Sequence, residues 1–385
     1  MKQKRALELT VILAVLAVVL LLTTTIVKKV WPSLGETGPQ RVETGPKTGT
    51  GSDQLPLQEE DIQKVKTNNL KVPAWKAESV IPTYHNSNLA LYSQRSKNQE
   101  ALSGVTVFLD PALGGNEQGY VMNSGLAATD PVKRVFTAAE LNLNLAYKIQ
   151  AKLEALGAKV ILIRAQDMPM SDTERVARLA HYLIGDFLEE LKEQNFKSDR
   201  LVELRQAIGQ EIAKKHEANY SSIFTKPGSG QDLRLILDLE KQYQEMFYLR
   251  INHLAEVDNN SQRGFHIRIL KPVLSAAEGS AEAPAYMNYE TEGSRRLADI
   301  LSTELIKIIP DLKNSDQTGI EEGLSDILRQ VNIKALEFSP GYLSNGRDLA
   351  LLLNPERQET IGEAVANAVY LFLSEQTVAE TEPQD

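Results

Sequence analysis

Residues 105–111 read Val-Thr-Val-Phe-Leu-Asp-Pro, and residues 138–163 read AAELNLNLAYKIQAKLEALGAKVILI. The first stretch is β-branched and aromatic and runs into an Asp-Pro turn, which predicts a short strand. The second predicts a helix over 138–156, because its leucine and isoleucine side chains recur at helical spacing. Gly157 is a helix stop signal, and 158–163 predicts a buried strand. The β-α-β order predicts an α/β fold with a mostly parallel sheet flanked by helices.

The rest of the C-terminal two thirds continues this alternation of helices and strands. Ser171 followed by Glu174 is a capping pattern for the next helix. Further helices are predicted over 175–195, 201–212, 233–246, 294–309 and 358–373, and strands over 247–251, 264–270 and 332–338. The low-complexity stretch 274–285 predicts a loop. Short strands or an edge segment are predicted from an apolar group ahead of the first strand: Trp75, Ile81, Tyr84, Leu89, Leu91 and Tyr92.

The N-terminus has a different character from the rest of the chain. Residues 9–27 are 19 uncharged, almost wholly apolar residues, long enough to reach about 28 Å as a helix and so to cross a bilayer. A cleaved signal peptide is the alternative, but no small-residue cleavage site follows. We expect a single-pass anchor with a short cytoplasmic head, 1–8, and the bulk of the protein on the extracytoplasmic side of the cell membrane.

Three further segments lie outside the predicted main domain, 105–374. Residues 28–72 are rich in Gly, Pro and Thr without apolar periodicity, which predicts a flexible stalk. Residues 73–104 predict an extension that packs on the main domain. Residues 375–385 are acidic and predict a disordered tail.

Composition excludes several classes of function. The net charge of −9 argues against nucleic acid as a partner. The chain has no cysteine, so neither a disulfide framework nor a thiolate metal site is possible. No Gly-x-Ser-x-Gly elbow or Walker phosphate loop occurs.

Several segments, in order, resemble the zinc-dependent N-acetylmuramoyl-L-alanine amidases that hydrolyse peptidoglycan. The segments are Val107–Asn116, Leu141–Ala146, Gly157–Arg164 with Ser171–Val176, Gly341–Asn345 and Leu351–Pro355. Each match alone is weak, but together they cover most of the chain beyond Val105. The resemblance implies an amidase-like α/β domain and a cell-wall role.

The resemblance also implies a zinc site, and the chain departs from the family at the positions that form it. The family holds zinc with a His, a Glu and a second His, and uses a further Glu as general base. The corresponding positions here are Leu113, Ala138, Asn252 and Ser339. We therefore expect a pseudoenzyme with no metal, no cofactor and no catalytic residue.

Neighbouring side chains are the possible substitutes at these positions. His253 follows Asn252, so on a strand it faces the opposite side, although an alignment slipped by one residue fits about as well. Glu337 shares a face with Ser339 but sits about 6.6 Å further along the strand. Glu140 lies about 200° around the helix from Ala138.

An insert, 182–245, separates parts that lie close in sequence in many family members. It is predicted to be largely helical, with an apolar stripe at Leu183, Phe187 and Leu191. In some amidases an inserted helix covers the active site and moves when an activator binds. Two interpretations remain open: a partner-binding element, or packing that fills the vacated cleft.

The sequence thus supports three hypotheses. The first is a membrane-anchored, catalytically degenerate amidase-like domain that binds peptidoglycan or a cell-wall protein, or regulates cell-wall hydrolysis. The second is an active zinc amidase with a rearranged site that cleaves the MurNAc–L-Ala bond. The third is a scaffold that kept only the fold.

Overall fold

The computed structural model describes residues 89–123, 135–213, 222–224, 230–256, 261–271, 286, 288–312 and 319–380. All of them belong to the unit Glu60–Asp385. The predicted head, anchor and stalk, and the loop predicted over 274–285, lie outside these residues. Within the described part of the chain, no helix has the length and apolar character needed to cross a membrane.

A six-stranded sheet forms the centre, in the order β4-β1-β5-β8-β6-β7. Its strands are β1 (Thr106–Pro111), β4 (Lys159–Leu162), β5 (Met246–Ile251), β6 (His266–Leu270), β7 (Ile320–Gly323) and β8 (Lys334–Ser339). Neighbouring strands are parallel except β6 and β8, which are antiparallel. The predicted mostly parallel sheet is confirmed. A separate hairpin pairs β2 (Val121–Asn123) with β3 (Val135–Thr137).

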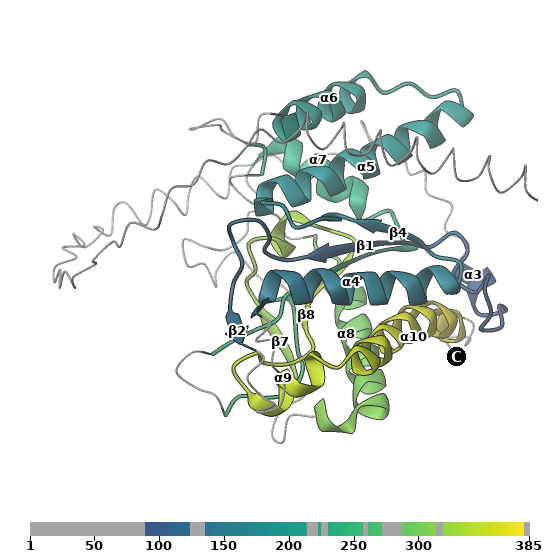
Figure 1. Cartoon of the computed structure of the whole chain (residues 1–385). Helices are drawn as coiled ribbons and strands as arrows, with labels where there is room; N and C mark the ends of the chain where they lie inside the picture. The colour runs from purple at the N-terminus through teal and green to yellow at the C-terminus, as the bar shows by residue number, and fades with distance from the viewer. Residues whose placement is uncertain are drawn as a thin grey trace, which may run out of the picture. The chain divides into compact units, whose positions relative to one another are not determined.

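Helices cover both faces of the sheet (Figure 1). One face packs against α4 (Ala138–Ala155), α8 (Thr291–Ile308) and α10 (Pro355–Glu380), around Val107, Leu249 and Phe372. The other packs against α5 (Asp172–Glu193), α6 (Asp199–Ala213) and α7 (Gln231–Glu240), around Phe108 and Tyr248. Shorter elements are α3 (Leu89–Tyr92), α9 (Gly346–Leu352), η3 (Pro310–Leu312) and η4 (Leu328–Gln330).

Local signals explain where the two helices after β1 begin. The Thr137 hydroxyl accepts a hydrogen bond from the backbone N–H of Glu140 at the start of α4. The Ser171 hydroxyl does the same for Glu174 at the start of α5, as the capping pattern predicts. Gly157, at φ +89°, ends the turn after α4, and a Cβ there would lie 2.6 Å from the Gln99 carbonyl oxygen.

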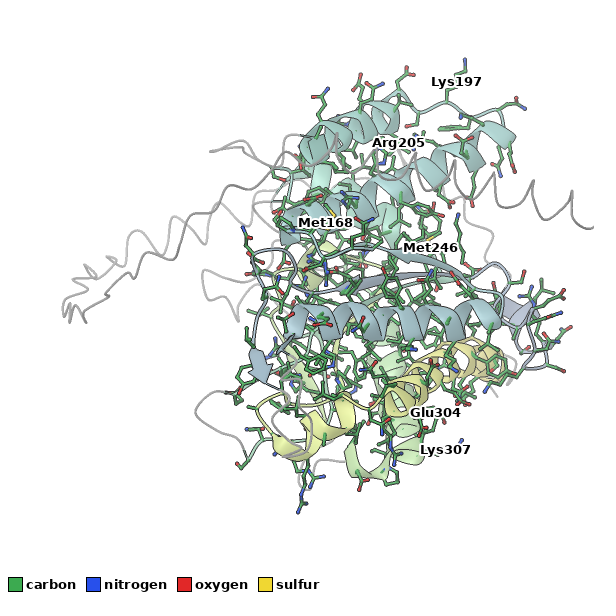
Figure 2. The ribbon with its side chains drawn as sticks, in the orientation of Figure 1. Met168, Lys197, Arg205, Met246, Glu304 and Lys307 are labelled. Atoms are coloured by element: carbon green, nitrogen blue, oxygen red, sulfur yellow. The ribbon has the colours of Figure 1, made fainter. Side chains whose placement is uncertain are left out.

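The predicted apolar stripe of the insert is confirmed: Leu183, Phe187 and Leu191 are at most 1% exposed. They lie in the core between α5, α6, α7 and the sheet. Figure 2 shows this layer, with Lys197 at its outer end and Met168 and Met246 near the sheet, while Glu304 and Lys307 lie on α8 across the sheet.

Four predictions about elements are wrong in detail. The helix expected over 233–246 ends at Glu240, because Met246 begins a strand buried on both faces. The strand expected to be buried, β4, is only half-buried, because it lies at the sheet edge. Of the two alternatives for the apolar group ahead of β1, the strand is wrong for the described members, because Leu89–Tyr92 form a helix; Leu89 and Tyr92 do pack on the core of the main domain. Residues 375–380, expected to begin a disordered tail, continue α10.

Candidate functional site

The loop after β1, which carries Leu113, has a tight backbone held by arginines. Leu113, Gly114 and Gly115 all have positive φ, at 66°, 123° and 59°. Arg164 donates to the carbonyl oxygens of Pro111 and Ala112 at 3.0 and 3.2 Å, and to that of Ala139 at the start of α4. The loop and the first turn of α4 are therefore joined through one buried guanidinium.

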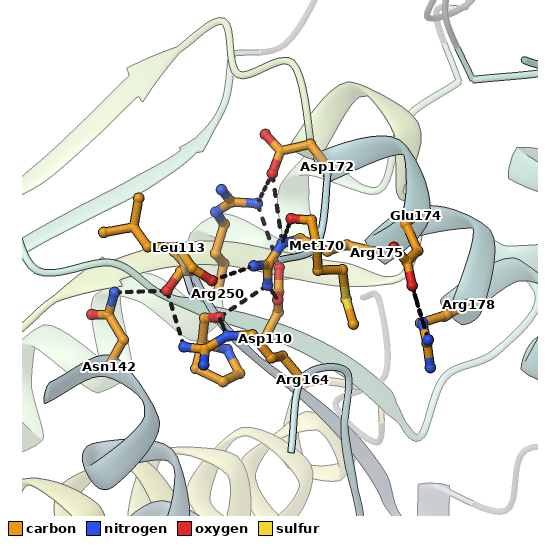
Figure 3. Close-up of polar contacts among 12 residues, drawn as sticks. Asp110, Leu113, Asn142, Arg164, Met170, Asp172, Glu174, Arg175, Arg178 and Arg250 are labelled. Atoms are coloured by element: carbon orange, nitrogen blue, oxygen red, sulfur yellow. Dashed lines mark hydrogen bonds and ion pairs between the residues drawn. The ribbon is translucent and has the colours of Figure 1, made fainter. Parts of the chain in front are cut away.

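A buried charged cluster lies beneath this loop (Figure 3). Arg175, on α5, pairs with Asp110 and donates to the Leu113 carbonyl oxygen at 2.7 Å. The second Asp110 oxygen accepts from the Tyr248 hydroxyl at 2.6 Å and faces Arg250 Nη1 at 3.4 Å. Because Asp110 is fully buried, these partners are what allow its charge in the core.

Leu113 and Ala138 lie together, in contact with one glycine. A Cβ on Gly119 would lie 2.4 Å from Leu113 Cδ1 and 3.0 Å from the Ala138 Cβ. Gly119 itself has φ +67°. Two of the four positions where the family carries its chemistry are thus brought together, and both side chains are apolar.

Asn252 and Ser339 lie at the ends of β5 and β8. The Asn252 amide donates to Glu337 Oε1 at 3.2 Å. The Ser339 hydroxyl accepts from the backbone N–H of Leu254 at 3.0 Å and donates to the Gly341 carbonyl oxygen at 2.8 Å. The side chains of both residues therefore take part in hydrogen bonds within the protein.

His253 points to the opposite face of the sheet from Asn252, as strand alternation predicts. Its backbone N–H and its Nδ1 both meet Asn142 Oδ1, at 2.9 and 2.6 Å, and the Asn142 amide donates to the Ala112 carbonyl oxygen. Since Oδ1 is an acceptor, Nδ1 carries the ring hydrogen. Burial lowers the pKa of His253 to about 3, so the ring is neutral.

A row of alternating charge crosses the sheet on the face that carries Tyr248. We call it the charge row: Asp110, Arg250, Glu337, Arg268 and Glu321, which are register partners on β1, β5, β8, β6 and β7. Opposite charges on directly paired residues stabilise neighbouring strands. Burial disfavours the charged form of Arg250 and is the largest single influence on its pKa. The attraction of Asp110, together with smaller contributions from Tyr248, Asp172 and Glu337, outweighs burial, so the pKa of Arg250 is raised.

The residues present do not fit the zinc that the resemblance implies. Zinc sites are built from His, Cys, Asp and Glu side chains, whereas the four positions offer two apolar side chains, an amide and a hydroxyl. The possible substitutes, His253 and Glu337, lie on opposite faces of the sheet. Glu140 is exposed on α4. Across the described residues, no three His, Cys, Asp or Glu side chains are grouped so that they could hold a metal ion.

Sequence reasoning missed the arginines that organise this region. Arg164 and Arg175 belong to segments that carry the family resemblance, but nothing in the sequence shows what they contact. A signal for the charge row did exist: Arg268 lies between Ile267 and Ile269, so a charge alternates with apolar residues at strand spacing.

Comparison with known proteins supports the expected family. Residues 192–370 match the family N-acetylmuramoyl-L-alanine amidase. The match includes the C-terminal segments of the resemblance and leaves Val107–Val176 outside. No curated protein sequence matches the chain.

Solved structures of amidases align with the chain at low identity. An N-acetylmuramoyl-L-alanine amidase from Clostridium difficile is 18% identical, with 72% of this chain and 98% of that one covered and a TM-score of 0.41. Ami1 from Mycobacterium smegmatis is 16% identical, with 71% and 99% covered and a TM-score of 0.43. The CwlD amidase of Clostridioides difficile, solved in complex with the GerS lipoprotein, is 16% identical, with 72% and 100% covered and a TM-score of 0.38.

These structural alignments are too distant to support a conclusion about family. The likeness to the N-acetylmuramoyl-L-alanine amidases therefore rests on the match of residues 192–370 to that family.

Proposed function

We propose that this protein is a catalytically inactive amidase-like domain that binds peptidoglycan or a cell-wall protein, or regulates wall hydrolysis. The observation that carries the proposal is the content of the four family positions. The side chains of Leu113 and Ala138 have no atom that can bind a metal, and they lie so close to Gly119 that a Cβ added there would be 2.4 and 3.0 Å from them. Asn252 and Ser339 make hydrogen bonds within the protein.

Binding without hydrolysis is physically reasonable because the two draw on different groups. Hydrolysis by a zinc amidase needs a metal-bound water and a base, whereas affinity for a glycan-peptide strand comes from contacts along the whole groove. A domain that has lost the first can keep the second.

The proposal includes a location and a class of partner. Residues 9–27 would anchor the chain in the cell membrane as a single pass, and the stalk 28–72 would let an extracytoplasmic domain reach the wall. Protease accessibility of the domain in intact and in permeabilised cells tests the topology.

Metal content and hydrolysis test the loss of catalysis. We expect full-length protein purified in detergent to contain no stoichiometric zinc and to release no stem peptide from peptidoglycan. An active zinc amidase, assayed on the same substrate, is the positive control. Stoichiometric zinc together with stem-peptide release would contradict the proposal. It would favour the alternative, an active amidase with a rearranged site; if Glu337 served in that site, Glu337→Gln would abolish release.

Sedimentation with purified sacculi tests the binding role separately. We expect the protein to sediment with peptidoglycan and to remain in the supernatant without it. A protein that stays in the supernatant, with no effect on the rate of an added active amidase, would favour a scaffold that kept only the fold.

A further inference from the structure

The two edges of the central sheet differ in chemistry. β7 forms one edge and carries Glu321 and Glu322, whose side chains are 48% and 38% exposed. Charged side chains on an edge strand oppose its pairing with a further strand. β4 forms the other edge, and after Lys159 it continues with three half-buried apolar residues, 160–162. An apolar edge of this kind lacks that protection and is normally covered by another segment.

The backbone of β4 has unused hydrogen-bonding groups on its open side. The N–H groups of Lys159 and Ile163 donate to carbonyl oxygens of the β1 chain at 2.8 and 2.9 Å. Because successive residues of a strand alternate, Val160 and Leu162 direct their N–H and C=O groups away from β1. Within the described part of the chain, these outward groups have no backbone partner. The open side of β4 therefore offers a short ladder to one more extended segment.

The chain enters the described region at the end of the sheet where β4 begins. α3 starts at Leu89, which packs on the core of the main domain. The loop after α3 contacts the turn that leads into β4, since the Leu102 N–H donates to the Leu156 carbonyl oxygen at 2.7 Å. Figure 1 shows α3 beside this end of the sheet. Whatever precedes Leu89 therefore approaches the domain close to the first residue of β4.

The sequence just before Leu89 suits an edge strand. Residues 80–84 read Val-Ile-Pro-Thr-Tyr, which is four strand-forming residues around one proline. Proline occurs in sheets on edge strands, with its missing N–H on the solvent side. With Pro82 directed outward, Ile81 and Thr83 direct their N–H and C=O groups inward. The connection to Leu89, residues 85–88, spans up to about 13 Å.

We propose that residues 80–84 dock on β4 as an additional edge strand, with Thr83 paired to Val160 and Ile81 paired to Leu162. The direction is antiparallel to β4, because the segment leads toward Leu89 at the start of β4. Paired residues share a face of the sheet, so Ile81 extends the apolar cluster that Val160 and Leu162 join.

This docking goes beyond the proposed function, because it depends on neither wall binding nor the loss of catalysis. It fixes the place where the N-terminal part of the chain joins the domain. It also removes an apolar edge that would otherwise be open to pairing with another protein chain.

Hydrogen exchange of the full-length protein in detergent tests the docking, followed by mass spectrometry over residues 158–164. Ile81→Pro removes an N–H that faces β4, whereas the matched control Val80→Pro removes one that faces solvent. We expect Ile81→Pro to speed exchange of the Val160 and Leu162 amides at least about tenfold, because they open to water, and Val80→Pro to leave it within about twofold of the wild type.

Disulfide formation provides a second readout, since the chain has no cysteine of its own. The pairing places Tyr84 opposite Lys159 in a non-hydrogen-bonded pair with about 4.5 Å between Cα atoms, which is within disulfide range. Tyr84→Cys with Lys159→Cys should therefore form an intramolecular disulfide, and adding Ile81→Pro should slow its formation about tenfold. Tyr84→Cys with Glu321→Cys is the control and should form none, because β7 lies about 24 Å away across the sheet.

Two results would overturn the docking. One is equal exchange of the β4 amides in the wild type and Ile81→Pro, or a disulfide that forms equally fast with and without Ile81→Pro. The other is protection of the β4 amides that rises with protein concentration, which would show that a second copy of the chain occupies this edge.

Discussion

Glu240 is a buried group whose protonation should have a large effect on stability. It is the last residue of α7 and is fully buried. One carboxyl oxygen accepts the backbone N–H of Asn332 at 2.6 Å, and the other has no hydrogen-bond partner. Burial raises its pKa from 4.5 to about 8, although the hydrogen bond from Asn332 acts in the opposite direction.

The sign of the effect follows from proton counting. Between a pH near 4.5 and a pH near 8, the folded protein keeps a proton on Glu240 that the unfolded chain has lost. The free energy of unfolding therefore falls as pH rises through this window and levels off above it. At about 1.4 kcal/mol per pH unit, the shift corresponds to a loss of up to roughly 5 kcal/mol.

Glu240→Gln should remove this dependence, because the amide has a similar shape and does not ionise. We expect the variant to match the wild type or to be about 1 kcal/mol less stable near pH 5, since one buried amide N–H lacks a partner. Near pH 8 it should be more stable by several kcal/mol. Urea unfolding followed by circular dichroism at several pH values measures the difference.

Glu359→Gln is the control of opposite sign. Hydrogen bonds from Lys148 and Lys152 lower the pKa of Glu359, so its contribution to stability is lost as pH falls and not as pH rises. If the difference between Glu240→Gln and the wild type is the same near pH 5 and near pH 8, Glu240 is not held protonated by burial, and the reasoning fails.

Three further predictions follow from the site. Asp110→Asn should lower the free energy of unfolding, measured in urea, by about 3–5 kcal/mol, because it leaves Arg175 and Arg250 buried beside a neutral group. A decrease of less than about 1 kcal/mol would refute the stabilising role of the cluster. Gly119→Ala should lower the free energy of unfolding by about 1–3 kcal/mol, because Gly119 has a positive φ and its new Cβ would clash with Leu113. Gly230→Ala is the control and should have a smaller effect, because a Cβ at Gly230 would meet no atom within 4 Å. Adding zinc or a chelator should leave the Tm unchanged, since a bound metal would raise it by mass action.

Much of the fold was predictable from local chemistry. The helix stripes, the cap at Ser171 and the β-α-β order each depend on residues close together in sequence, so their signals survive without tertiary context. Boundaries were less predictable. The apolar run through Met246 is compatible with a helix or a strand until its neighbours in the sheet are known.

The residues of the candidate site could be predicted from the sequence, but their contacts in space could not. Family resemblance identified Leu113, Ala138, Asn252 and Ser339, and residue chemistry indicated that none suits zinc. The side chains that hydrogen-bond to the loop carrying these residues could not be predicted. Arg164 and Ala112, for example, are 52 residues apart and meet only because β1 and β4 are adjacent.

The sequence by itself determined the alternation of helices and strands, the apolar stripe of the insert and the absence of donor atoms at two of the family positions. These depend on residue type and on periodicity along the chain. Only the tertiary structure decided that Glu337 stands between Arg250 and Arg268, because the order β5-β8-β6 joins strands that are far apart in sequence. Register across such strands is set by how their buried faces pack, so the charge row exists only in the folded sheet.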